Sequence, residues 1–321
     1  MVGQASSGVT TVCIVVNYFS STMIERCLEA MLTELPNRIV IYDNSCDESE
    51  YQNLERLKLG YHNLEVLRGA KNLGFGAGVN AAIGHTAQYE PCIFWVLNPD
   101  AVPQPGCLNA LQEAVEANEM CLVSSVVSFG ETPTADQSIW FYRGGYDLIA
   151  GKVWHDDFRA PLNKMLESQP KTWTTPFLPG TSFATNLETW ERLGGFREDL
   201  FLYWEDVELC ERAQKSSIKT LVARDALVWH GEGGTTNFGE DGHSKTYYYW
   251  MNKNRYVISG THSGRKFVGN PAVAWETFKC ISRPLLTPQK DRLGKTWSAI
   301  RGTKDGIMAL LWPPRPSEVS K

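Results

Sequence analysis

Two adjacent carboxylates, Glu205 and Asp206, follow the aromatic segment FLYW and begin a helical pattern that runs to Gln214. The positive end of a helix dipole favours the ionised form of carboxylates in the first turn. A carboxylate that stays charged beside an apolar wall can act as a general base toward a hydroxyl group. Acidic residues are also common at helix N-termini for structural reasons, so the pair by itself leaves both interpretations open.

Further residues that could bind a ligand or a metal lie where apolar runs end. Asp100 closes CIFWVLNPD and could bind a divalent cation beside a pyrophosphate, although an Asn-Pro-Asp turn is the structural alternative. Asp43 closes RIVIYD, and with Asn44 it could accept the imide N–H of a pyrimidine base; helix capping is the competing explanation. His230 closes a strand-like run and is either a metal ligand or an ordinary strand-end histidine.

The segment NLGFGAGVN is rich in glycine and opens a helical pattern. A dinucleotide fingerprint, G-x-G-x-x-G, would need glycine where Val79 stands, and no acidic residue follows at the required distance. A hydride-transferring dehydrogenase is therefore disfavoured. The glycines favour close approach of backbone N–H groups to phosphate oxygens at a helix N-terminus, with a purely structural turn as the alternative.

The elements that must position these residues alternate along the first hundred residues. The runs TTVCIVVNY, NRIVIYDNS, NLEVLR and CIFWVLNPDA are typical of strands, and helical patterns separate them. A continuous apolar run indicates a strand buried on both faces. The pattern predicts an α/β fold with a mostly parallel sheet flanked by helices.

Ligands of open α/β sheets bind at the carboxyl ends of the strands. Asn17, Asp43 and Asp100 stand at such ends, and Asn72 follows the third strand, so we expect the four side chains to share one crevice. After about residue 125 the pattern loosens, but a helix is predicted over Leu187–Leu193 with Asn186 as its N-cap. The last sixty residues are typical of helices interrupted by prolines.

The chain has 321 residues, 43% of them hydrophobic, which suits one large or two modest folded domains. No apolar stretch approaches the ~20 residues of a membrane-spanning helix, and the N-terminus lacks the features of a signal peptide. We therefore expect a cytoplasmic protein. Its eight scattered cysteines form no C-x-x-C pair and are expected to be small core residues.

Charge is unevenly distributed along the chain. Residues 253–321 hold 13 Lys and Arg against 4 Asp and Glu, whereas the whole chain has a net charge of −5. The basic segment is either a solvated face or a surface attracted to an anionic membrane or a phosphate-bearing substrate. The acidic remainder argues against a nucleic-acid partner.

Seven motifs in order give the chain a specific resemblance. VVNYFS, IYDNS, NLGFGAGVN, LNPDA, PGTSFATN, GGFREDLFLYWEDVELCERA and VWHGEGGTT resemble those of inverting family 2 glycosyltransferases of the GT-A fold, over about residues 10–255. Among these, the chain looks most like bacterial rhamnosyltransferases that build cell-surface polysaccharide from dTDP-L-rhamnose. The segment AIRGTKDGIMALL is similar to the C-terminal helix of that subfamily.

The resemblance implies a division of the chain and a donor site. Residues 1–252 would form the catalytic domain, with a nucleotide-sugar half (1–125) and an acceptor half (126–252), and 253–321 a basic helical extension. Donor-nucleotide contacts would come from Val16, Asn17, Tyr18, Asp43, Asn44, Asn72, Gly74, Phe75, Gly78, Asn80, Asn98 and Asp100.

The same resemblance implies a cation on the donor pyrophosphate. Asp100 matches the last aspartate of the family's D-x-D motif, and His230 matches a histidine that joins the cation in some relatives. Asn98 replaces the first aspartate, which removes one negative charge and leaves the dependence on Mg²⁺ or Mn²⁺ open. Asn-Pro-Asp is frequent in rhamnosyltransferases of this type.

On the acceptor side, the resemblance implies that Asp206 deprotonates the acceptor hydroxyl, with Glu205 as its neighbour. Acceptor contacts would come from Gly180, Thr181, Tyr203 and Trp204. The expected reaction is inverting transfer of L-rhamnose to an O-antigen, lipopolysaccharide-core or polyprenyl-diphosphate-linked saccharide, with peripheral attachment to the inner face of the plasma membrane. A UDP-sugar-dependent galactofuranosyl or hexosyl transferase is the alternative, followed by a non-catalytic sugar-nucleotide binding protein.

Overall fold

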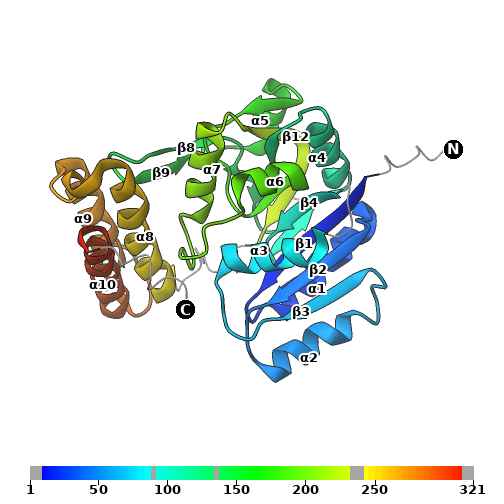
Figure 1. Cartoon of the computed structure of the whole chain (residues 1–321), viewed down its shortest axis with the longest axis horizontal. Coiled ribbons are helices and arrows are strands. Elements are labelled where there is room, and N and C mark those ends of the chain that lie inside the picture. Colours follow the sequence, from blue (N-terminus) through cyan, green and yellow to red (C-terminus); the bar gives the residue numbers. More distant parts are fainter. Residues whose placement is uncertain (1–8, 88–91, 134–136, 232–241, 313–321) are drawn as a thin grey trace. The chain divides into compact units, whose positions relative to one another are not determined.

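The computed structural model describes residues 9–87, 92–133, 137–231 and 242–312. The chain divides into two compact units. Figure 1 shows the helices and strands of both. The first unit comprises residues 1–144, 155–199 and 209–231, and the second comprises 145–154, 200–208 and 232–321.

The first unit begins with four parallel strands in the order β4-β1-β2-β3. They are β1 (Thr10–Asn17), β2 (Arg38–Asp43), β3 (Leu64–Arg68) and β4 (Cys92–Leu97). The register sets Asn17 beside Asp43 at the carboxyl ends of neighbouring strands. The runs predicted as strands are therefore strands, and two of the predicted site residues are neighbours.

The helices between these strands have identifiable ends. They are α1 (Ser21–Glu34), α2 (Glu48–Leu57) and α3 (Phe75–Thr86). Asp47 caps α2 by accepting a hydrogen bond from the backbone N–H of Glu50, and α1 ends at Leu35 in the left-handed conformation. Because Pro36 follows, the helix cannot continue.

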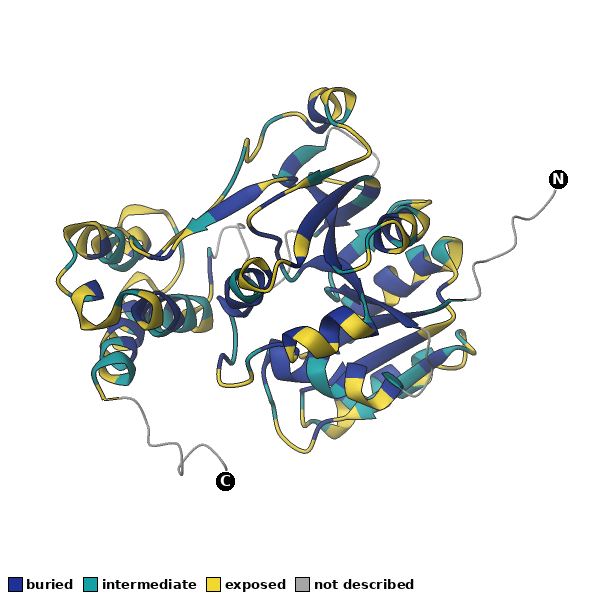
Figure 2. Cartoon of the chain, turned by 45° about the horizontal axis from the view of Figure 1, so that its top comes forward, coloured by how far each residue is buried: buried dark blue, intermediate teal, exposed yellow. Residues whose placement is uncertain are grey.

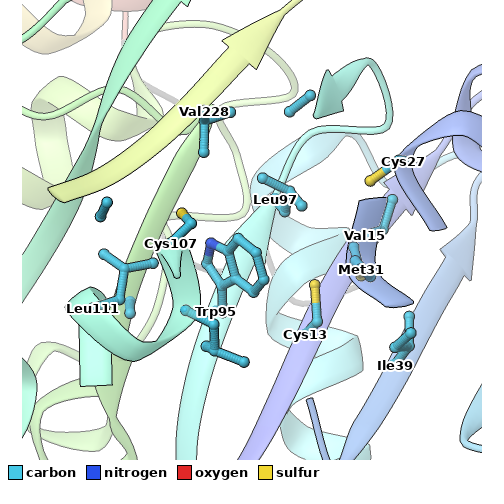
Figure 3. Close-up of a cluster of buried hydrophobic side chains, with 14 of the residues drawn as sticks. Cys13, Val15, Cys27, Met31, Ile39, Trp95, Leu97, Cys107, Leu111 and Val228 are labelled. Atoms are coloured by element: carbon cyan, nitrogen blue, oxygen red, sulfur yellow. The ribbon is translucent and has the colours of Figure 1, made fainter. Parts of the chain in front are cut away.

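The two faces of the sheet bury alternate residues of each strand. Cys13, Val15 and Trp95 face a core built with α1 and with α4 (Cys107–Glu116), which Figure 3 shows in close-up. On the opposite face α3 lies against β1 so closely that a Cβ atom on Gly78 would be 3.1 Å from Val16 Cγ1. Strands covered on both faces are continuous apolar runs, as the sequence predicted.

The rest of the first unit extends the sheet and makes it mixed. Its strands are β5 (Ala101–Pro103), β6 (Cys121–Phe129), β7 (Ser138–Phe141), β10 (Thr172–Thr174), β11 (Ser182–Asn186) and β12 (Lys219–His230). β11 inserts antiparallel between β4 and β6, while β6 and β12 pair in parallel. The α/β class is confirmed, but the sheet is not uniformly parallel beyond β4.

Three more helices belong wholly or partly to this unit: α5 (Leu162–Ser168), α6 (Leu187–Leu193) and α7 (Glu205–Lys215). The prediction for α6 is confirmed in detail, because Asn186 accepts a hydrogen bond from Thr189 N–H and Gly194 ends the helix with a positive φ. The division between the units falls within α7, whose first turn belongs to the second unit.

The second unit is mainly helical. Beside the strand pair β8 (Gly144–Asp147) and β9 (Lys152–His155), it contains α8 (Lys245–Ser263), the short helix η2 (Gly264–Phe267), α9 (Pro271–Leu286) and α10 (Arg292–Leu311). The domain boundary expected after residue 252 falls inside α8, and residues 200–208 belong to this unit. Within the described residues, no helix combines the length and apolar character needed to span a membrane.

Candidate active site

A buried polar cluster occupies the carboxyl ends of β1 and β2. Asn17 Nδ2 lies 2.9 Å from Asp43 Oδ1 and 3.1 Å from Glu50 Oε1, and donates to both. Ser45 N and Oγ each donate to Asp43 over 2.9 Å. Asn17 and Asp43 are fully buried. Asp43 therefore fixes the end of β2, and its expected contact with a base stays a prediction.

Glu50 is a member of this cluster that sequence analysis missed. Its two carboxylate oxygens accept hydrogen bonds from Ser21 N and Ser21 Oγ, both over 2.9 Å, at the start of α1. The adjacent Tyr18 is 54% exposed and forms an edge-to-face pair with Phe19 at 5.0 Å between ring centroids. An exposed aromatic ring beside a rigid polar floor offers a surface on which a base can stack.

The glycine-rich loop is held against the end of β2 by Asn44. The amide of Asn44 donates to Gly74 O over 2.8 Å and accepts from Leu73 N–H over 3.0 Å. Asn72 Oδ1 accepts from Gly74 N–H over 2.9 Å, and Gly74 has a φ of 85°, which favours glycine. The loop thus delivers the N-terminus of α3 to the carboxyl ends of the strands, as expected.

Asn80 contacts the turn that follows α6. Its Nδ2 donates to Phe196 O over 2.8 Å, and its Oδ1 accepts from Phe196 N–H over 2.8 Å. Phe75 packs against the same residue, with ring centroids 5.8 Å apart. The amide of Asn80 orders the turn after α6, and its expected donor contact stays a prediction.

Asn98 and Asp100 follow β4 in a tight turn. Asn98 N–H donates to Thr181 O over 2.8 Å, which joins this turn to the start of β11. Thr181 is buried, and the preceding Gly180 is so close to Phe75 that a Cβ atom there would be 2.9 Å from the ring. The residues expected on the acceptor side at 180–181 therefore border the loop expected to hold the donor.

Asp100 and His230 meet as a buried pair. His230 Nε2 lies 3.1 Å from Asp100 Oδ1, and the side chains are 6% and 7% exposed, respectively. His230 Nε2 and Asp100 Oδ2 make no hydrogen bond within the described residues. β12 pairs with β5 so that His230 lies opposite Ala101, which brings the two side chains together from distant parts of the sequence. Residues 232–241, which continue the VWHGEGGTT motif, lie outside the described residues.

The Asp100 and His230 pair fits a divalent cation in part. A carboxylate and an imidazole are both ligands for Mn²⁺, and buried atoms without hydrogen bonds are costly unless another partner satisfies them. The described residues contain no group of three or more His, Cys, Asp and Glu side chains that could hold a metal. A cation here would therefore take its remaining ligands from a bound molecule or from water.

The carboxylate pair begins α7 in the second unit. Glu205 is buried, and its Oε2 makes no hydrogen bond within the described residues. Burial, together with repulsion from the neighbouring Asp206, raises the pKa of Glu205 well above its usual value. Asp206 is half-buried, and its Oδ1 accepts from Val207 N–H over 2.8 Å.

The turn that presents this pair is strained and is held by α8. Tyr203 and Trp204 both have positive φ values, 65° and 73°. The buried Asn254 donates through Nδ2 to Leu202 O and to Tyr203 O, each over 2.9 Å. Consecutive aromatic residues in the left-handed region persist only where the surroundings impose them. Asn254 thus fixes the turn before Glu205, and nothing in the sequence pattern indicated it.

Trp204 is buried and therefore contributes to packing, whereas Tyr203 packs edge-to-face on Tyr247 of α8 at 5.2 Å. The expected stacking of these two rings on an acceptor sugar stays a prediction.

The model of the family described as glycosyl transferase family 2 matches residues 12–194, more than half of the chain. The chain belongs to glycosyltransferase family 2. The matched span includes the clusters at the ends of β1, β2 and β4, and it ends before Glu205. This protein is therefore a glycosyltransferase, as its motifs indicated.

Similar proteins agree with this assignment. The glycosyltransferase is 26% identical over 267 residues to the N-acetylglucosaminyl-diphospho-decaprenol L-rhamnosyltransferase of Mycobacterium tuberculosis, a match that covers 78% of this chain and 84% of that protein.

Two solved structures share the GT-A fold. Residues 1–349 of S. aureus TarS in complex with UDP-GlcNAc give a TM-score of 0.56 at 15% identity, covering 94% of this chain and 82% of that one. The mannosyltransferase PcManGT from Pyrobaculum calidifontis in complex with GDP-Man and Mn²⁺ gives a TM-score of 0.52 at 16% identity. This match covers 98% of this chain and 79% of that one.

Proposed function

We propose that this glycosyltransferase transfers L-rhamnose from dTDP-β-L-rhamnose to a saccharide hydroxyl of a lipid-linked cell-envelope precursor, with inversion to an α-rhamnoside. The observation that carries the proposal is the similarity, over 78% of the chain, to a rhamnosyltransferase whose name specifies a GlcNAc-diphospho-decaprenol acceptor. The Asn98-Pro99-Asp100 sequence supports the same subfamily. Because the acceptor would be lipid-linked, the proposed place of action is the inner face of the plasma membrane.

The donor nucleotide would lie across the carboxyl ends of β1 and β2. The polar floor made by Asn17 and Asp43 is rigid because its members are bonded to one another. Tyr18 would stack on the base. The pyrophosphate would approach the N-terminus of α3, where the N-cap residue Gly74 lets the backbone come close and has no side chain to cap the helix.

Asp100 and His230 would hold a divalent cation, because a buried carboxylate oxygen and a buried imidazole nitrogen make no hydrogen bond within the described residues. Bound there, Mg²⁺ or Mn²⁺ would neutralise negative charge on the departing nucleotide. Asn98 contributes no charge, so the site binds a cation mainly through Asp100. Backbone N–H groups of α3 would stabilise the same leaving group.

Asp206 would act as the general base. It accepts the proton of the acceptor hydroxyl while the hydroxyl oxygen attacks the anomeric carbon in line with the departing phosphate oxygen. One C–O bond forms to the acceptor, and one C–O bond breaks to the nucleotide diphosphate, which leaves with the electron pair. A single displacement of this kind inverts the configuration.

Glu205 would support this role by remaining protonated. Its raised pKa follows from burial and from repulsion by Asp206, so a proton on Glu205 removes a second negative charge from the pair. Asp206 would then be the charged member of the pair and the one available to accept a proton. Glu205 would donate a hydrogen bond to the acceptor.

A donor panel tests the proposal. The purified protein would be incubated with dTDP-L-rhamnose, UDP-glucose, UDP-galactofuranose and GDP-mannose, with and without Mn²⁺, while release of free nucleotide is followed in the absence and presence of a polyprenyl-diphosphate-GlcNAc acceptor. We expect turnover of dTDP-L-rhamnose alone. Turnover of a UDP-sugar instead would overturn the donor assignment, and no turnover of any donor with acceptor present would favour a sugar-nucleotide binding protein.

A further inference from the structure

The outward face of α10 is unusually apolar for a surface helix. Leu293, Trp297, Ile300 and Met308 are exposed and follow one another at intervals of four, three and eight residues, so they lie along one stripe of the helix. Trp297 is 66% exposed. Such a row of large apolar side chains differs from the single exposed hydrophobic residues that normally occur on protein surfaces.

Small residues make the closest contacts on the inward face of the same helix. The buried positions of α10 include Ala299, Gly302 and Gly306. A Cβ atom on Gly302 would collide with Tyr249 O of α8, and one on Gly306 would lie 2.6 Å from Lys253 O. The closest approach of α10 to α8 therefore uses these small residues. Ile307 and Leu310 also pack inward, near the end of the helix, but the row from Leu293 to Met308 stays exposed.

The neighbouring helix α9 also exposes large apolar side chains. Trp275 and Phe278 are 59% and 58% exposed, and their rings stack with centroids 5.7 Å apart. Leu285 and Leu286 extend the exposed apolar surface to the end of the helix. In Figure 2 the ribbons of these helices include many exposed residues, whereas the strands of the large sheet are mostly buried.

The same two helices are rich in exposed basic residues. Residues 271–312 contain seven Lys and Arg against three Asp and Glu. All three acids are paired with a basic residue: Glu276 with Lys279, Asp291 with Lys245 and Asp305 with Arg301. Six of the basic residues are exposed: Lys279, Arg283, Lys290, Arg292, Arg301 and Lys304.

We infer that the exposed faces of α9 and α10 dock on an anionic lipid bilayer, with their aromatic and aliphatic side chains inserted among the headgroups. Tryptophan, phenylalanine and leucine beside lysine and arginine are the composition that binds helices in the plane of a membrane interface. A second copy of this chain is a poorer occupant, because two such faces would bring like charges together. Attachment brings the enzyme to lipid-linked acceptors, so the inference deepens the proposed function.

Flotation with vesicles tests this inference. The full chain would be mixed with vesicles of phosphatidylcholine alone or with 30% phosphatidylglycerol, at 0.1 and 0.5 M NaCl. The test variants are Trp275→Ala/Phe278→Ala and Trp297→Ala/Ile300→Ala. The matched control is Leu32→Ser/Leu59→Ser, which removes two exposed leucines from the first unit, and circular dichroism would confirm that each variant is folded.

We expect the wild type and the control to float with the anionic vesicles, and each aromatic variant to bind at least 5-fold more weakly. Raising the salt weakens the charge attraction but leaves residual binding that depends on the aromatic residues. Absence of flotation, or binding that the aromatic variants leave unchanged, would overturn the inference. Sedimentation that shows a dimer broken by Trp297→Ala would overturn it in favour of a second copy.

The flotation assay needs no sugar transfer and therefore fails independently of the proposed function. A protein that floats as expected but turns over no rhamnose donor would refute the donor assignment alone. One that uses dTDP-L-rhamnose but does not bind vesicles would refute the docking surface alone.

Discussion

Replacement of Asn254 by alanine removes the two hydrogen bonds that hold the turn before Glu205. Both bonds are 2.9 Å long, and the donor side chain is buried. A typical hydrogen bond contributes about 1 kcal/mol net, so the turn loses about 2 kcal/mol of support. The left-handed backbone of Tyr203 and Trp204 costs about 1 to 2 kcal/mol per residue, and this strain favours relaxation once the support is gone.

The expected consequence is a loss of turnover with little loss of donor binding. If the released strain leaves the relaxed turns about 2 kcal/mol lower in free energy than the native turn in the variant, the active population falls about 30-fold, since 1.4 kcal/mol corresponds to a factor of ten. We therefore expect kcat to fall about 30-fold in Asn254→Ala while the Kd for dTDP, measured by calorimetry, stays within about 2-fold of the wild type.

Asn252→Ala is the matched control on the same helix. Asn252 is also buried, but its Nδ2 donates to Tyr248 O within α8 and has no part in the turn. This variant should lose stability without the selective loss of kcat. Equal kinetics for Asn252→Ala and Asn254→Ala, or a Kd effect in place of a kcat effect, would refute the positioning role of Asn254.

Three further predictions follow from other parts of the structure. Asp100→Ala and His230→Ala should each weaken dTDP binding in the presence of Mn²⁺ by about 10-fold and abolish any stimulation by the cation; calorimetry that shows unchanged affinity would contradict the cation site. Burial and two nearby basic side chains lower the pKa of His243 to about 4. Between pH 6.5 and 4, His243 therefore binds a proton in the unfolded chain but not in the folded chain. The free energy of unfolding should fall on acidification, by about 2 kcal/mol from pH 7 to 5. Thermal melts of His243→Phe should show a flatter dependence on pH, and an unchanged slope would exclude this histidine as its source. Gly78→Ala should destabilise the protein and weaken donor binding because its Cβ would crowd β1. Gly84→Ala has open space on the same helix and should stabilise the protein by about 1 kcal/mol in urea unfolding. If Gly78→Ala proved more stable than Gly84→Ala, the close packing of α3 would be contradicted.

The alternation of the first hundred residues predicted the fold because both sides of each parallel strand are covered. Strands β1, β2 and β4 are continuous apolar runs, and polar residues follow at their carboxyl ends. This pattern depends only on local sequence and on burial, which is why it could be interpreted without a structure. Local reasoning also correctly placed a helix at Leu187–Leu193 with Asn186 as its N-cap.

Long-range pairing could not be derived in that way. The direction of β11 follows from its neighbours β4 and β6 and not from the five residues of the strand itself. Similarly, the contact between Asp100 and His230 depends on the pairing of β5 with β12. The individual residues were identified, but the sequence could not show that they form a pair.

Buried polar residues that act through others were missed for a related reason. Glu50 looks like an ordinary acidic residue in the first turn of α2, and Asn254 is one of several polar residues in α8. Each becomes informative only when its hydrogen-bond partners on other elements are known. Asn80 shows the same limit: the resemblance implied a donor contact, which stays a prediction, while its hydrogen bonds to Phe196 could not be predicted from the sequence.

The most direct test of the central claim compares the wild type with Asp206→Asn, using dTDP-β-L-rhamnose and a polyprenyl-diphosphate-GlcNAc acceptor, with product configuration determined by NMR. The wild type should form an α-rhamnoside. Asp206→Asn should bind dTDP within about 2-fold of the wild type while its rate falls 10²- to 10⁴-fold, the usual contribution of a general base. A β-linked product, appreciable transfer by Asp206→Asn, or loss of its dTDP binding would contradict the account.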